Sequence, residues 1–97
     1  LEVVVSRAQI PAGVELPMHY HPGEEFVYVA SGTVVLKLQG QPDKEFSAGT
    51  AGVVPMRAIH GAVAKTSVDL VVFRVHDKGQ PVRVLVKPDG QEVPLDK

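Results

Sequence analysis

The sequence contains no cysteine and no tryptophan, and aromatic residues make up only 5% of its 97 positions. Without cysteine, neither disulfide bonds nor thiolate ligands can contribute, so any bound metal must rest on nitrogen and oxygen donors. An excess of positive charge is also lacking, since ten lysines and arginines are balanced by eleven acidic residues and the basic side chains are scattered. We therefore expect no nucleic-acid partner.

Long hydrophobic runs are missing as well, and none approaches the roughly 20 residues that a transmembrane helix needs. No signal-peptide pattern precedes the first expected strand. We expect a cytoplasmic protein with no membrane partner. The chain begins at Leu1 rather than methionine, which leaves a removed leader open.

The residues that are present fit a globular protein, because 44% are hydrophobic and 22% are charged. The length suits one domain over residues 1–97. No window keeps a 3.6-residue apolar period, and proline or glycine interrupts the chain roughly every eight to twelve residues. This pattern predicts an all-β fold, an antiparallel sandwich or barrel. The expected strands cover residues 2–10, 16–21, 26–30, 33–39, 44–46, 51–55, 59–64, 68–76 and 81–86.

Alternation along these strands indicates which side chains face the interior. Val34, Leu36 and Leu38 alternate with more polar positions, which predicts one buried and one solvated face. If Glu25 faces inward, Val27 and Val29 do so too, with Phe26 and Tyr28 on the opposite face. Residues 87–97 form a C-terminal tail with a weak edge strand at best, since Pro94 cannot donate a backbone hydrogen bond.

Three of the four histidines lie in two short windows that otherwise have strand and turn composition. His19 and His21 are two residues apart, so on an extended backbone both imidazoles project from one face. Glu25 follows the turn pair Pro22-Gly23, which can direct the chain back toward that face. With His60 from the second window, these side chains form a mixed nitrogen and oxygen donor set for a divalent transition metal. The alternative is that His19 and His21 are exposed and that His60 is a hydrogen-bonded core residue.

The first window resembles the first motif of the cupin superfamily. Its fixed positions are met at every spacing by Gly13, His19, His21, Glu25 and Gly32, so that the motif spans residues 13–32. The second cupin motif falls on residues 49–64, where Gly49, Pro55 and His60 match. Arg57 stands where a glycine is usual, and Ala64 where an asparagine is usual.

This resemblance implies a small single cupin domain with a double-stranded β-helix, or jelly-roll barrel. It also implies one metal per chain held by His19, His21, Glu25 and His60, with Fe, Mn, Ni, Cu and Zn all open. Among cupins, quercetinase-like dioxygenases are one possibility, with decarboxylases, isomerases and lyases also represented. Cupins commonly pair through apolar strands such as residues 3–5 and 84–86, so we expect a homodimer.

Several other side chains are candidates for a substrate pocket. Arg57 could bind a carboxylate or enolate oxygen at the pocket mouth, or be a solvated loop arginine. Met18 and Met56 flank the two ligand windows and could line a pocket or fill the core. Tyr28 is expected on the outer face of its strand, with contact to the site as the alternative. For His76 we expect a surface role rather than a fifth metal ligand.

These residues favour a metal-dependent enzyme that acts on a small organic substrate, and the resemblance to cupins implies a dioxygenase-like reaction. In this hypothesis Glu25 also acts in catalysis, as a carboxylate that accepts a proton. An oxygenase needs little further acid–base chemistry from the protein, which fits the scarcity of other ionisable groups. The alternatives are a non-catalytic module that binds or senses a small ligand, and a metal that only stabilises the fold.

Overall fold

The computed structural model describes residues 1–81 and 83–95, and all of its regular structure is antiparallel β-sheet. No stretch within these ranges forms a helix long and apolar enough to cross a membrane. The ten strands are β1 Glu2–Ile10, β2 Glu15–Tyr20, β3 Glu24–Ser31, β4 Thr33–Leu38, β5 Lys44–Ser47, β6 Ala51–Val54, β7 His60–Ala64, β8 Val68–His76, β9 Arg83–Val86 and β10 Glu92–Leu95.

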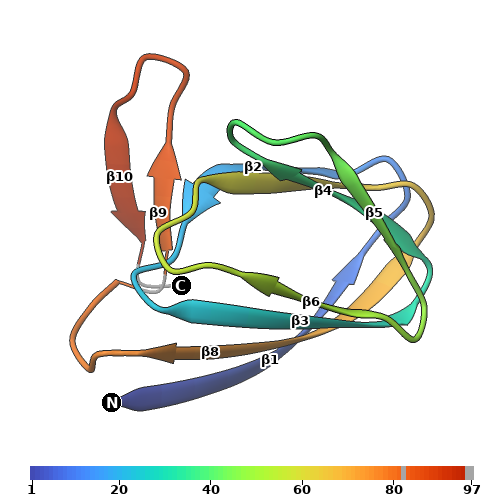
Figure 1. Ribbon diagram of the computed structural model, residues 1–97, viewed down its shortest axis with the longest axis horizontal. Coiled ribbons are helices and arrows are strands. Elements are labelled where there is room, and N and C mark those ends of the chain that lie inside the picture. Colours follow the sequence, from blue (N-terminus) through green and yellow to red (C-terminus); the bar gives the residue numbers. More distant parts are fainter. Residues whose placement is uncertain (82, 96–97) are drawn as a thin grey trace.

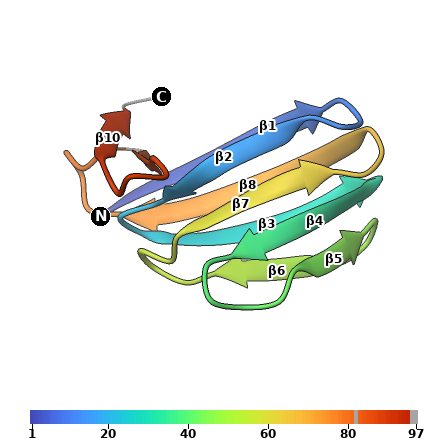
Figure 2. The ribbon, with the colours of Figure 1, turned by 90° about the horizontal axis from the view of Figure 1, so that it is seen from above.

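These strands form two sheets that face each other as a sandwich. One sheet has four strands in the order β1-β8-β3-β6, and the other has six in the order β10-β9-β2-β7-β4-β5. Figure 1 shows the four-stranded sheet below β2, β4 and β7, and Figure 2 shows the same strands from above. The prediction of an all-β fold built from antiparallel strands is confirmed.

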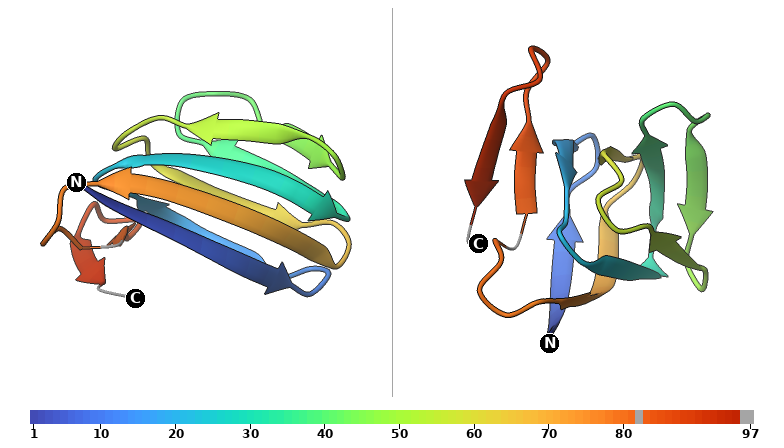
Figure 3. Two further views of the ribbon diagram at one scale, coloured as in Figure 1. Left: turned by 90° about the horizontal axis from the view of Figure 1, so that it is seen from below. Right: turned by 60° about the vertical axis from the view of Figure 1, so that its left-hand side comes forward.

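The β9–β10 hairpin stands apart from the main body of the sandwich and extends the six-stranded sheet at one end (Figure 3). Pro94 lies in β10 opposite Val84, at the outer edge of this sheet, as the missing N–H of proline requires. The expectation that residues 84–86 form an apolar edge is therefore wrong, because β9 is paired with β2 on one side and β10 on the other. In the described chain β1 remains an edge strand.

The hydrophobic core lies toward the end of the sandwich away from this hairpin. Aliphatic side chains alternate along the strands with exposed ones, and those that form the buried core are Ile10, Val29, Val34, Ala64, Val68, Leu70 and Val72. Val27 and Val29 point inward and Phe26 and Tyr28 outward, as the alternation predicts. The apolar side chains at this end of the sandwich leave the opposite end for polar groups.

A β-bulge in β2 sets the direction of the side chains at that opposite end. Leu16 pairs with Ala62 and His19 with His60, so β2 carries two residues where β7 carries one. Pro17 is one of these two, which fits because proline has no N–H to give to the ladder. The extra residue places both Leu16 and His19 on the inner face of the sheet.

Candidate metal centre

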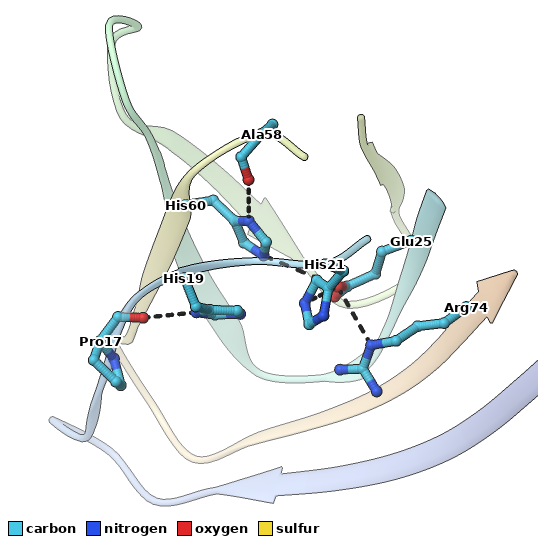
Figure 4. Close-up of polar contacts among 7 residues, drawn as sticks. All are labelled: Pro17, His19, His21, Glu25, Ala58, His60 and Arg74. Carbon is cyan, nitrogen blue, oxygen red and sulfur yellow. Dashed lines mark hydrogen bonds and ion pairs between the residues drawn. The ribbon is translucent and has the colours of Figure 1, made fainter. Parts of the chain in front are cut away.

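The structure brings His19, His21 and His60 together at the end of the sandwich next to the β9–β10 hairpin. His19 lies near the end of β2, His21 directly follows that strand, and His60 is the first residue of β7. All three are buried, and one ring nitrogen of each lies within 4.8 Å of the others. Figure 4 shows the rings converging from two segments that are far apart in the sequence.

Hydrogen bonds fix the ring orientation of two of these histidines. His19 Nδ1 lies 2.7 Å from the carbonyl oxygen of Pro17, and His60 Nδ1 lies 2.8 Å from that of Ala58. Because a carbonyl only accepts, the proton of each neutral ring is on Nδ1 and the lone pair is on Nε2. Such a bond to the second ring nitrogen is the usual companion of a metal-binding histidine.

Burial also keeps these imidazoles in the form that binds metals. Desolvation lowers the pKa of His19 from 6.5 to about 4, against the opposing effect of its hydrogen bond to Pro17. The pKa of His60 is lowered for the same main reason. Neutral imidazoles with inward-facing Nε2 lone pairs suit a first-row transition metal, and the donor types leave its identity open among Fe, Mn, Ni, Cu and Zn.

Glu25, the predicted fourth ligand, lies beside the three histidines on β3. Its Oε2 atom is in direct contact with Nε2 of His21, 3.9 Å from Nε2 of His60 and 3.5 Å from Nε of Arg74. Burial raises the pKa of the Glu25 carboxyl, but the hydrogen bond with His21 and the charges of His21 and Arg74 outweigh burial and lower it. Glu25 is therefore ionised at neutral pH, and its direct coordination of a metal stays a prediction.

A cavity of about 230 Å³ extends from this site into the sandwich. Its polar lining consists of His19, Glu25, His60, Arg74 and Arg83. The remaining lining is almost entirely aliphatic, apart from one phenylalanine and two glycines: Ala8, Ile10, Leu16, Val27, Val29, Val34, Leu36, Phe46, Gly52, Val54, Gly61, Ala62, Leu70 and Val72. An apolar chamber with a few polar groups at one end is the usual form of a small-molecule site.

The four side chains predicted for the substrate pocket do not line this cavity. Tyr28 is 46% exposed on the outer face of its strand, and Met56 is 54% exposed. Met18 lies on the β2 bulge, where its sulfur covers Gly61. Arg57 adopts a φ of 63° in an exposed turn, with its guanidinium 6.0 Å from the ring centre of Tyr20. Any contact of these four residues with a ligand remains a prediction.

Sequence reasoning missed Arg74 and Arg83, which do line the cavity. Arg74 follows Leu70 and Val72 at a spacing of two residues, and this alternation already indicated an inward-facing arginine. The surface role predicted for His76 was wrong, because this residue is only 3% exposed and its Nε2 lies 3.0 Å from the carboxylate of Glu2. Pairing of β1 with β8 places Glu2 opposite His76, which local sequence does not reveal.

Comparisons with solved structures give the same fold. The DMSP lyase DddQ from Ruegeria pomeroyi has a TM-score of 0.77 and 21% identity over 92% of this chain, which covers 45% of that protein. An RmlC-like cupin from Shewanella frigidimarina has a TM-score of 0.72 and 26% identity over 80% of this chain and 69% of its own. The salicylate 1,2-dioxygenase from Pseudoaminobacter salicylatoxidans has a TM-score of 0.70 and 22% identity over 74% of this chain and 20% of its own.

This chain thus spans less than half the length of the lyase and a fifth of that of the dioxygenase. Among curated proteins, none is a significant match to the sequence. The family model described as a cupin domain matches residues 6–76, which include every histidine discussed above. Since this match covers well over half of the sequence, the chain belongs to the cupin domain family.

Proposed function

We propose that this protein is a metal-dependent enzyme of the dioxygenase type that acts on a small organic substrate inside the cavity. One observation carries the proposal: three buried imidazoles, two with Nε2 lone pairs directed inward by backbone hydrogen bonds, meet at the polar end of an apolar chamber. A closed structural site would not need an adjoining chamber of about 230 Å³.

His19, His21 and His60 would hold the metal, with Glu25 as a fourth ligand or as its neighbour. When bound, the metal supplies a Lewis-acidic, redox-capable centre at which substrate and O₂ can be gathered. The aliphatic walls bind the apolar body of the substrate and keep bulk water away. Dioxygenation places both atoms of O₂ in the product, so the reaction requires no external reductant.

Glu25 is the group of this chain best suited to accept a proton from the substrate. It is buried, it is ionised at neutral pH, and it lies at the polar end of the cavity. Arg74 contacts the carboxylate from the opposite strand and would hold it in place before and after proton transfer. A positioned base of this kind typically contributes about 10²- to 10⁴-fold to a rate.

The similar structures are compatible with more than one reaction. One is a DMSP lyase and another is a salicylate 1,2-dioxygenase. At sequence identities of 21% and 22%, the similarity supports a shared fold and does not identify the reaction. A base beside a metal serves both a lyase and an oxygenase. We favour oxygenation because, of the described residues that line the cavity, Glu25 is the one carboxylate.

Oxygen uptake tests the proposal directly. The metal-free protein is loaded anaerobically with Fe(II), and in parallel with Mn(II), Ni(II) or Cu(II), then mixed with aerated enol and catechol substrates. We expect stoichiometric uptake with at least one metal, loss of it in His60→Ala, and retention in His76→Ala. No uptake with any combination of these metals and substrates counts against an oxygenase.

The main alternative is a module that binds or senses a small ligand without turnover. It is favoured by the same scarcity of acid and base groups around the cavity. In that case a small molecule would remain bound through purification and be released unchanged on denaturation. If the metal only stabilises the fold, chelation would lower the melting temperature strongly and no exchangeable water would be seen on the metal.

A further inference from the structure

The cavity contains two arginines in different situations. Arg74 on β8 has its Nε atom 3.5 Å from the carboxylate of Glu25, an ion pair without a hydrogen bond. Arg83 on β9 also lines the cavity, and its Nε atom is buried without a hydrogen-bond partner among the described residues. A buried guanidinium donor without an acceptor is costly, so this position favours an anion from outside the chain.

Strand pairing directs Arg83 toward the metal centre. In the β2–β9 pair, His19 is opposite Leu85 and Tyr20 is opposite Val84. Residues directly opposite each other share a face, and residues two apart in a strand do so too, so Arg83 lies on the same face as His19. The guanidinium therefore belongs to the polar end of the cavity and not to the outer surface of the β9–β10 hairpin.

The charges at this end of the cavity are unbalanced. Two guanidinium groups, from Arg74 and Arg83, accompany the one carboxylate of Glu25 among the described lining residues. A divalent metal on neutral histidines adds two further positive charges. The region would then carry an excess of positive charge in an apolar surrounding, where unscreened charges interact more strongly than in water. An anionic ligand would reduce that excess.

We infer that the ligand of this cavity is a small carboxylate, with its carboxylate group held by Arg83 and its apolar body among the aliphatic side chains. This inference rests on the proposed function and specifies its substrate class. A planar guanidinium can hold a carboxylate through two parallel hydrogen bonds, which a neutral alcohol or ketone does not offer. Arg83 fills this role rather than Arg74, whose Nε is already directed at Glu25.

Calorimetric titration of the Zn(II)-loaded protein tests the inference without any turnover. The probes are hexanoate and benzoate, each compared with its uncharged partner, 1-hexanol or benzyl alcohol. We expect each carboxylate to bind at least about tenfold more tightly than its alcohol, as a charge-assisted pair implies. Arg83→Gln should remove most of this difference while zinc content, from elemental analysis, stays unchanged.

Arg7→Gln is the matched control, because it removes the same charge from an exposed arginine on β1 that does not line the cavity. It should keep the preference for carboxylates. Equal affinity of Arg83→Gln and the unmodified protein for hexanoate, with zinc retained, would overturn the inference. So would alcohols that bind as tightly as the acids.

If Arg83→Gln does not fold, Arg83→Lys tests the inference instead. Lysine keeps the positive charge but lacks the planar guanidinium that can donate two parallel hydrogen bonds. A fall in hexanoate affinity of about threefold or more supports the inference, and unchanged affinity refutes it. Failure of the proposed function can be distinguished from failure of this inference. If only the proposed function fails, carboxylates still bind but no oxygen uptake is observed. Oxygenation of an enol that carries a carboxylate, with the same KM in Arg83→Gln as in the unmodified protein, would refute only the inference.

Discussion

His19 and His60 lie directly opposite each other on the paired strands β2 and β7, with ring centres 4.3 Å apart. Each donates a hydrogen bond from Nδ1 to the carbonyl oxygen two residues earlier in its own segment. The same local arrangement thus occurs twice, on segments 41 residues apart, and turns both Nε2 atoms inward. The fold therefore orients both side chains as a metal site would require.

This orientation leads to a prediction for metal content. We expect the purified protein to hold about one divalent metal per chain and His60→Ala to lose most of it, because one of three converging nitrogens is gone. His76→Ala is the matched control, since His76 is also a buried histidine but pairs with Glu2. Elemental analysis of both variants decides, and full retention in His60→Ala would remove that residue from the site.

The lowered histidine pKa values predict how the metal-free protein responds to acid. In the unfolded chain His19 takes up a proton near its ordinary pKa of 6.5, whereas in the fold this occurs near 4. Between these two pH values the unfolded state binds more protons, so the free energy of unfolding falls as the pH falls. The loss is at most about 1.4 kcal/mol per pH unit for each such proton.

Urea titrations of the metal-free protein from pH 7.5 to pH 4 measure this effect. His19→Gln should flatten the profile in the window between pH 6.5 and 4, and an unchanged slope would argue against a buried neutral His19. With metal bound, the same low pKa means that protons compete for this nitrogen only at lower pH than the reference value for histidine suggests.

Much of this structure follows from the sequence alone. The bounds of the two longest strands, β1 at residues 2–10 and β8 at residues 68–76, agree with those predicted from the sequence. Their β-branched residues and the flanking turns are local signals. The convergence of the histidines was inferred from motif spacing, which holds because the cupin topology fixes where the two motifs meet.

The parts that could not be predicted depend on pairing between distant segments. The bulge at Pro17 is visible only once β2 is aligned with β7, and it changes which β2 side chains face inward. His76 ends its predicted strand beside a polar turn, which indicated a surface role, yet pairing of β8 with β1 buries it against Glu2. Arg83 enters the cavity because β9 joins β2, a contact between residues about 65 positions apart.

Glu25→Gln tests the dual role given to this carboxylate. The amide has nearly the same shape but cannot accept a proton as a base, so we expect substrate turnover to fall by about 100-fold or more. Three histidines still converge in this variant, so the metal should be retained with a weaker affinity. Turnover and metal content are measured on the same samples, with the exposed neighbour variant Glu24→Gln as control. Unchanged turnover in Glu25→Gln would exclude it as the base.

The homodimer expected for this chain remains a prediction, and the outer face of the four-stranded sheet is where we expect it. Val5, Phe73, Phe26 and Val53 are direct neighbours across β1, β8, β3 and β6, and all four are exposed. A continuous apolar row of this kind is uncommon on a monomer. Phe73→Lys should give a monomer by light scattering at micromolar concentration, whereas Gln9→Lys, at the end of the same face, should not.

Gly13 and Gly32, the first and last glycines of the first motif, allow a matched test of packing near the turns. Both have positive φ, 82° and 83°, so alanine is strained at either position. A Cβ at Gly13 meets nothing within 4 Å, whereas a Cβ at Gly32 would lie 2.0 Å from the carbonyl oxygen of Ser67. We expect Gly13→Ala to cost about 1–2 kcal/mol of unfolding free energy.

Gly32→Ala should cost clearly more, about 3 kcal/mol or above, because the backbone of the β7–β8 turn must also move. Chemical denaturation of the metal-free variants compares the two without a contribution from bound metal. Since the strain from positive φ is common to both, the difference between them isolates the close approach of Gly32 to Ser67. Equal losses in the two variants would mean that the turn at Ser67 yields readily, and that its carbonyl does not fix the position of the β3–β4 connection.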